Sequence, residues 1–150
     1  MCDAKAYLRK LELADVHINN KLEDLQKLRT MVTKITSTIT PVSVSGSGSQ
    51  DKLGDTIAKI VDLQSEINDK IDRYVDMKRE VNALIDQMED PDQVQVIHKR
   101  YVEYKPLELI ALEMNCTYRN VCYIHGKALQ TVEALLKGGE DNGKQSVASI

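Results

Sequence analysis

The first part of the chain places apolar residues at the spacing of one helix face. Between residues 4 and 35 they recur at steps of three, four or seven, at Leu8, Leu11, Ile18, Leu22, Leu25 and Val32. We expect this helix to fray across 33–40, because the threonines there lose side-chain freedom in a helix and compete for its backbone hydrogen bonds. Pro41 then ends it. The Ser- and Gly-rich stretch 41–50 predicts a flexible connector.

A second and more regular pattern fills residues 53–88. Its apolar positions alternate steps of four and three, which is the heptad repeat of a coiled coil, over roughly 54 Å of helix at about 1.5 Å per residue. We expect its seam to consist of Leu53, Ile57, Ile60, Gln64, Ile67, Ile71, Tyr74, Lys78, Val81, Ile85 and Met88. Gln64 and Lys78 are polar, and polar seam residues usually fix the register or the number of paired helices.

A helix of this length needs a partner for its apolar stripe. The first helix supplies one, and the connector is long enough to reverse the chain, so residues 1–89 are expected to form a long antiparallel helical hairpin. Self-association through the same seam, as a homodimer, is the alternative. Both can hold at once if hairpins pair as a four-helix assembly. The hairpin is then either a scaffold or an arm for oligomerisation or partner binding.

Residues 90–137 predict a domain of three shorter helices. Asp90 can cap the first helix, Pro91 suits its first position, and Gln93 stands where a capping-box partner belongs. We expect buried faces formed by Val94, Ile97, Tyr101 and Val102, by Leu107, Ile110, Ala111 and Met114, and by Val121, Ile124, Ala128, Val132 and Leu135 or Leu136. A polar turn at 115–117 separates the second helix from the third. Two helices joined by such a turn are typical of helix-turn-helix proteins, whose second helix enters the DNA major groove.

Composition and charge narrow the class of protein. The chain has 150 residues, of which 42% are hydrophobic and 29% charged, as is typical of a folded soluble protein. Its formal net charge of −3 does not resemble that of a general binder of polyanions. Residues 1–97 carry 13 Lys and Arg against 17 Asp and Glu, a net −4, whereas residues 98–137 carry six against four, a net +2. A DNA-facing surface is therefore expected in the C-terminal part.

Other classes of site find little support in the residues. Three cysteines without a secretory signal indicate a reducing cytoplasm, and the absence of a run of about 18 apolar residues argues against a membrane span. Cys116, Cys122 and His125 suggest zinc, but a fourth ligand and a Cys-x-x-Cys pair are lacking, so we expect no metal and no cofactor. Without a phosphate-binding glycine loop, and with its acidic residues at surface spacing, the chain is not expected to be an enzyme. Residues 138–150 predict a disordered tail.

The C-terminal part carries a resemblance to region 4 of bacterial sigma factors. The residues that carry it are Arg100-Tyr101, Glu108-Leu109-Ile110-Ala111, Val121 and His125-Gly126-Lys127-Ala128-Leu129. In region 4 an Arg-Tyr pair precedes a Glu-Ile-Ala helix, and an Arg-Ala-Leu run closes the recognition helix. Residues 5–137 as a whole resemble a family of small phage and prophage proteins of Gram-positive bacteria, described as sigma-factor-like or late-gene transcriptional regulators.

The resemblance implies a module that binds double-stranded DNA in the cytoplasm of a bacterial host and that can also contact host RNA polymerase. It places the recognition helix at 118–136. Carried over position by position, the groove-facing residues are Thr117, which is also the candidate helix cap, Tyr118, Arg119, Asn120, Tyr123 and Lys127. The corresponding phosphate contacts are His98, Lys99 and Arg100.

Two interpretations of the chain follow. Arg119 is the only long cationic side chain at the front of the recognition helix. Phosphate contacts from Lys and Arg dominate affinity for DNA, so a single module should bind weakly, and a dimer would roughly double the contacts. The rival interpretation is an adaptor or inhibitor that binds a host protein through the helical hairpin without reading DNA. The acidic overall charge favours that rival.

Overall fold

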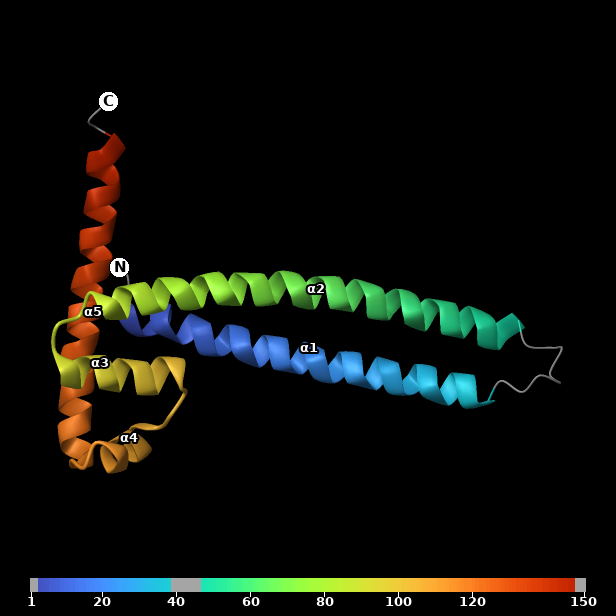
Figure 1. Cartoon of the computed structure of the whole chain (residues 1–150), viewed down its shortest axis with the longest axis horizontal. Coiled ribbons are helices and arrows are strands. Elements are labelled where there is room, and N and C mark those ends of the chain that lie inside the picture. The colour runs from blue at the N-terminus through green and yellow to red at the C-terminus, as the bar shows by residue number, and fades with distance from the viewer. Residues whose placement is uncertain (1–2, 39–46, 148–150) are drawn as a thin grey trace. The chain divides into compact units, whose positions relative to one another are not determined.

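The computed structural model describes residues 3–38 and 47–147, which contain helices and turns but no strand. In chain order the elements are α1 Ala4–Thr38, α2 Ser47–Asp86, α3 Pro91–Ile97, the π-helical turn η1 His98–Val102, α4 Leu107–Glu113 and α5 Tyr118–Val147 (Figure 1). The predicted all-α class is confirmed. The chain divides into two compact units, one formed by Met1–Leu13 with Val75–Ile150 and the other by Ala14–Tyr74.

Within the unit Ala14–Tyr74, α1 and α2 lie side by side and run in opposite directions (Figure 1). Ile18 and Leu25 of α1 are buried, as is Ile67 of α2. Beside these residues Lys21 Nζ lies 2.9 Å from Glu66 Oε1. The hydrogen bond from Lys21 holds the pKa of Glu66 below its usual value.

The packed line on α2 agrees only in part with the predicted seam, of which Ile67, Val81, Ile85 and Met88 are buried. Thr56 is only 6% exposed, and its hydroxyl donates a hydrogen bond of 2.7 Å to the carbonyl four residues earlier. The seam residues Ile57 and Ile71 are instead 46% and 37% exposed. Leu63, one position before the seam, is half-buried like Gln64 on it. The covered line therefore keeps the seam residue Ile67 but includes Thr56 and Leu63, which lie one position before the seam residues Ile57 and Gln64.

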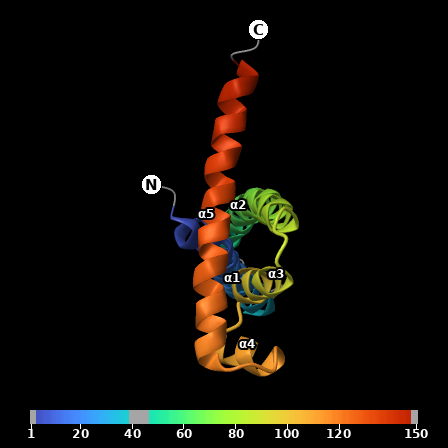
Figure 2. The same ribbon diagram turned by 90° about the vertical axis from the view of Figure 1, so that its left-hand side faces the viewer.

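The second unit, Met1–Leu13 with Val75–Ile150, has two clusters of buried side chains. The first contains Ala4, Leu8, Val81, Leu84, Ile85, Met88, Ile97, Tyr101, Ala128 and Val132. The second contains Val96, Ile110, Ala111 and Val121. Val96, which the sequence did not place in the core, and its neighbour Ile97 belong to different clusters, so α3 is packed on two sides. Figures 1 and 2 show α3 beside α5 and α4 near the start of α5.

The end of α1 corrects one prediction. The helix continues to Thr38, so the fraying expected from Thr33 onward is wrong for the described residues, and 39–40 lie outside them. The hydroxyls of Thr30, Thr33 and Thr36 donate to carbonyls four residues earlier at 2.9, 3.1 and 3.0 Å. These bonds satisfy the hydroxyl groups inside the helix, which is why the threonines do not end it.

Two further boundaries differ from the prediction. α2 begins at Ser47, so the last part of the expected connector, 47–50, is helical, while 41–46 lies outside the described residues. α5 continues through Val147, so the expected disordered tail is wrong for 138–147, and 148–150 lies outside the described residues. A formed helix gains about one hydrogen bond for each residue that it adds, which offsets the low helix preference of Gly and Ser.

Candidate nucleic-acid interface

The turn between α4 and α5 determines where α5 begins. After α4 the N–H of Cys116 donates to the carbonyl of Ala111 at 3.0 Å, which closes the helix end. Asn115 has a φ of 53°, a left-handed conformation that Asn tolerates better than most residues. Thr117 Oγ1 then accepts a hydrogen bond of 3.1 Å from the N–H of Asn120, which confirms the predicted cap.

The first three turns of α5 have one open face. The six residues that the sequence assigned to the DNA groove are all exposed: Thr117, Tyr118, Arg119, Asn120, Tyr123 and Lys127. Val121 and Ala128 are fully buried on the other side of the helix. Tyr118 and Tyr123, at 51% and 64% exposed, add two aromatic rings to the open face. The described residues therefore pack on the opposite side of α5 and leave this face uncovered.

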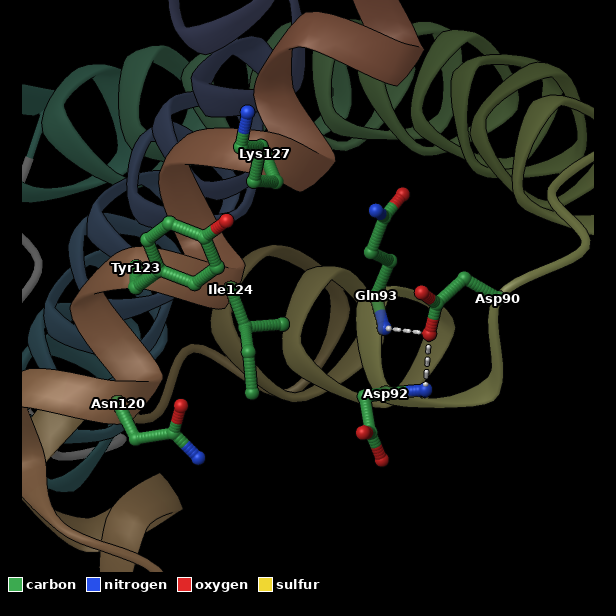
Figure 3. A pocket seen from close by; sticks show the side chains of 7 residues that line it. All are labelled: Asp90, Asp92, Gln93, Asn120, Tyr123, Ile124 and Lys127. Carbon is green, nitrogen blue, oxygen red and sulfur yellow. Dashed lines mark hydrogen bonds between the residues drawn. The ribbon is translucent and has the colours of Figure 1, made fainter.

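A pocket of about 380 Å³ lies beside the open face (Figure 3). It is lined by Asp90, Asp92 and Gln93 from the start of α3 and by Asn120, Tyr123, Ile124 and Lys127 from α5. Asp90 Oδ1 accepts hydrogen bonds from the N–H groups of Asp92 at 2.9 Å and Gln93 at 3.3 Å, so the predicted cap of α3 is confirmed. Gln93 Oε1 accepts from the Thr131 hydroxyl at 2.8 Å, and this bond ties α3 to α5 in place of the expected capping box.

The pocket gives the open face a mixed charge. Lys127 Nζ lies 5.8 Å from the centroid of the Tyr123 ring. The carboxylates of Asp90 and Asp92 line the same pocket and oppose the approach of phosphate, since exposed charges act over about 8–10 Å at physiological salt. Sequence reasoning missed these two residues as part of the site, because only the packing of α3 on α5 brings them there. No local pattern in the sequence signals that contact.

Lys99 and Arg100, assigned to phosphate contacts, are half-buried and engaged with protein groups. Lys99 Nζ donates to Glu113 Oε2 at 3.0 Å, and Arg100 Nη1 donates to the carbonyl of Lys105 at 3.3 Å. Both side chains are therefore engaged by groups of the same domain. Their partners lie in α4 and in the loop before it, which the spacing of a single helix does not reveal.

Lys105 extends these contacts into a network of polar side chains. Its Nζ lies 2.8 Å from Glu113 Oε1 and 3.2 Å from Glu103 Oε2, and His98 Nδ1 lies 3.8 Å from Glu103 Oε1. Hydrogen bonds from Lys105 and then Lys99 hold the pKa of Glu113 below its usual value, while Glu113 and then Glu103 raise the pKa of Lys105. The network connects η1 to the end of α4.

Behind the open face, Tyr101 and His125 form a hydrogen-bonded pair. Tyr101 is 2% exposed, its hydroxyl lies 2.7 Å from His125 Nε2, and the two rings stack with centroids 5.7 Å apart. Burial, followed by the charges of Lys5 and Arg100, lowers the pKa of His125 and favours its neutral ring. A neutral ring can accept a hydrogen bond from the Tyr101 hydroxyl at Nε2. Across residues 3–38 and 47–147, no group of three His, Cys, Asp or Glu side chains is placed to hold a metal ion.

Comparison with known proteins places the chain in a family. The family described as Protein of unknown function (DUF1492) matches residues 34–133, well over half of the chain. The chain belongs to the DUF1492 family. The DUF1492 match runs from the end of α1 into α5 and includes the open face and its pocket. No curated protein and no solved structure matches the chain. None of the helices described for this DUF1492 protein is long and apolar enough to cross a membrane.

Proposed function

We propose that this DUF1492 protein is a transcription regulator of the phage or prophage sigma-factor-like kind, which binds double-stranded DNA in the cytoplasm of a bacterial host. In this proposal α1 and α2 form an antiparallel hairpin, and the three helices after it form a domain like sigma region 4. α4, the turn 115–117 and α5 are its helix-turn-helix, with 118–136 as the recognition helix. The observation that carries the proposal is the open face of α5, where six polar or aromatic side chains are exposed while the opposite side is buried.

Each exposed side chain has a role that its chemistry allows. Arg119 can donate two hydrogen bonds to guanine O6 and N7, and Asn120 can pair with adenine N6 and N7. Thr117, Tyr118 and Lys127 carry hydrogen-bond donors suited to phosphate oxygens, which position a protein on DNA without reading its sequence. The carboxylates of the pocket confine phosphate contacts to the first turns of α5 and keep the affinity of one module low.

Replacement of Arg119, the cation at the start of α5, tests this proposal. Binding sites are selected by the purified wild-type protein from a random duplex pool, and affinity for the best site is measured over a range of salt concentrations. Arg119→Ala should weaken binding by about 1–3 kcal/mol if Arg119 contacts a base, or lower the salt slope by about 1 if it contacts phosphate. Selection of no site, or equal affinity and equal salt slope for the variant, would contradict the proposal.

A control on the same helix separates contact with DNA from a general effect of charge. Lys137 is exposed on α5, and its Nζ lies 3.4 Å from Glu133 Oε1, outside the open face. Lys137→Ala removes the same formal charge as Arg119→Ala and should leave affinity within about twofold of wild type, because nonspecific charge effects between exposed groups are screened by salt.

A second candidate function is supported by a different observation. Apolar side chains stand exposed along α1 and α2, among them Val61 at 58% and Val16 at 47%, as they do on helices that bind other proteins. An adaptor would use the hairpin to bind a host protein, with RNA polymerase the first to test, without reading DNA. Purified polymerase should then form a stoichiometric complex with the chain that survives Arg119→Ala, and the absence of such a complex would reject polymerase as the partner.

A further inference from the structure

Between residues 54 and 71, α2 carries its charge on one side. The charged residues are Asp55, Lys59, Asp62, Glu66, Asp69 and Lys70, at steps that return to one helix face. The other side carries the uncharged residues Gly54, Ile57, Val61, Gln64, Asn68 and Ile71, at alternating steps of three and four. Glu66 pairs with Lys21 of α1, so the charged side already has an ionic partner within the chain. We call the other side the neutral face.

The neutral face is open to solvent. Ile57 is 46% exposed, Val61 58% and Ile71 37%. A groove of about 410 Å³ runs beside it and is lined by Leu22, Leu25, Arg29, Gln64, Ile67, Asn68 and Ile71. Leu22, one of the α1 residues that line this groove, is itself 42% exposed. Apolar residues in heptad spacing are usually covered by another helix, but the described residues of the unit Ala14–Tyr74 leave the neutral face uncovered.

The order of side chains on the neutral face fits a second copy of the same chain. Ile57 lies seven residues before Gln64 and Ile71 seven residues after it. When two such faces pair antiparallel about Gln64, Ile57 of one copy meets Ile71 of the other. Val61 of one copy then lies near Asn68 of the other. Because the face has no charge, pairing with itself creates no repulsion between like charges. The Gln64 amide can both donate to and accept from its counterpart.

We propose that two copies of this chain pair antiparallel through Ile57, Val61, Gln64, Asn68 and Ile71, with Gln64 at the twofold axis. Such an interface uses the same patch on both copies, as twofold dimers do. A polar residue at the centre of a heptad seam fixes its register and the number of helices. Arg29 at the groove is long enough to keep its guanidinium in water while its stem covers apolar surface. The proposal concerns self-association and does not depend on DNA binding.

A pair of matched variants tests the neutral face. Sedimentation of the full-length wild-type chain should give twice the mass of one chain at micromolar concentration. Val61→Glu should weaken dimerisation about tenfold or more, because its carboxylate would be buried without a partner. Val16→Glu is the control, since Val16 is an exposed valine of α1 outside the groove lining and should leave the dimer intact. Because both valines are exposed, helix content by circular dichroism should stay unchanged.

Three outcomes of this experiment would overturn the proposal. The first is a monomeric wild-type chain at high micromolar concentration. The second is a dimer whose dissociation constant Val61→Glu leaves unchanged. The third is equal weakening by Val61→Glu and Val16→Glu, which would mean that the neutral face is not the specific interface.

A compensating variant tests the direction of pairing. When Asn68→Lys is added to Val61→Glu, an antiparallel dimer places each new glutamate near a new lysine of the other copy. Dimerisation should then recover relative to Val61→Glu alone, because the buried carboxylate gains a partner. A parallel dimer would instead place glutamate near glutamate and lysine near lysine. A double variant that dimerises no better than Val61→Glu would overturn antiparallel pairing about Gln64.

Discussion

At the scale of single residues, the balance of charge on α5 sets what the open face can bind. Arg119 and Lys127 are its cations, while Asp90 and Asp92 line the pocket next to it. Lys99, a further cation that the sequence assigned to phosphate contact, is paired with Glu113, and its Nζ lies 3.0 Å from Glu113 Oε2. An open face with so few cations is better suited to hydrogen bonds with base edges than to many contacts with the phosphate backbone.

The Tyr101–His125 pair predicts that the folded state weakens in mild acid. Burial first, and then Lys5 and Arg100, lower the pKa of His125 in the folded chain, whereas the unfolded chain has the ordinary value of about 6.5. Between the two values the unfolded chain binds a proton that the folded chain does not. The free energy of unfolding should therefore be unaffected by this residue above about pH 6.5 and decrease as the pH falls from there through the lower folded pKa.

Urea unfolding followed by circular dichroism across this pH range measures the effect. His125→Gln cannot take up the proton, so its unfolding free energy should vary less with pH than that of the wild type. His17→Gln, at an exposed position of α1, is the control and should keep the wild-type dependence. The same pH dependence in wild type and His125→Gln would rule out this origin.

At the scale of elements, the start of α5 depends on contacts that the turn and η1 provide. Thr117 caps α5, and Lys99 and Lys105 hold the end of α4 through Glu113. These ion pairs are partly exposed and each contributes little, so the cap and the buried residues behind it carry more of the stability. The orientation of α5, and with it of the open face, thus depends on a few local contacts.

Loss of the cap should loosen the front of α5. Thr117→Ala removes the acceptor of the Asn120 N–H and should lower the free energy of unfolding by about 1 kcal/mol. Hydrogen exchange should accelerate at the amides of the first turn of α5, beginning with Asn120. Thr33→Ala is the matched control, because Thr33 sits inside α1 and its hydroxyl bonds only a carbonyl of that helix. Equal exchange rates at Asn120 in Thr117→Ala and wild type would count against the cap.

The helices and their starting caps can be predicted from sequence because the deciding interactions are local. Asp90 and Thr117 each bond amides two or three residues ahead, so residue type and spacing suffice to recognise them. The residues at which helices end are harder to predict. α1 passes its threonines and α5 passes Gly138 and Gly139, because each further residue extends a helix that is already formed.

The candidate site is predictable only in part, for a related reason. Periodicity alone places Asn120, Tyr123 and Lys127 on the exposed side of α5. It cannot place Asp92 beside them or Glu113 beside Lys99, since those neighbours come from other elements. The exposed Ile57 shows the same limit on α2, where the partner helix decides which of two adjoining apolar lines is covered.

At the scale of the whole molecule, the proposed DNA-binding face and the neutral face complement each other. Affinity for DNA rises steeply with the number of phosphate contacts, so a dimer holding two helix-turn-helix modules would bind far more tightly than one chain. Twofold dimers of this kind bind sites made of two related half-sites. Self-association would thus compensate for the small number of cations on each α5.

The two proposals together predict a specific coupling between the neutral face and DNA. Sites selected by the wild-type chain should contain two symmetry-related half-sites, and Val61→Glu should bind one half-site with about half the salt slope, because it brings about half the phosphate contacts. Val16→Glu should behave as wild type. Selection with each protein, followed by titration on full and half-sites, measures this. If Val61→Glu abolishes the dimer yet binds the full site with unchanged affinity and slope, each chain reads DNA alone and the dimer serves another purpose.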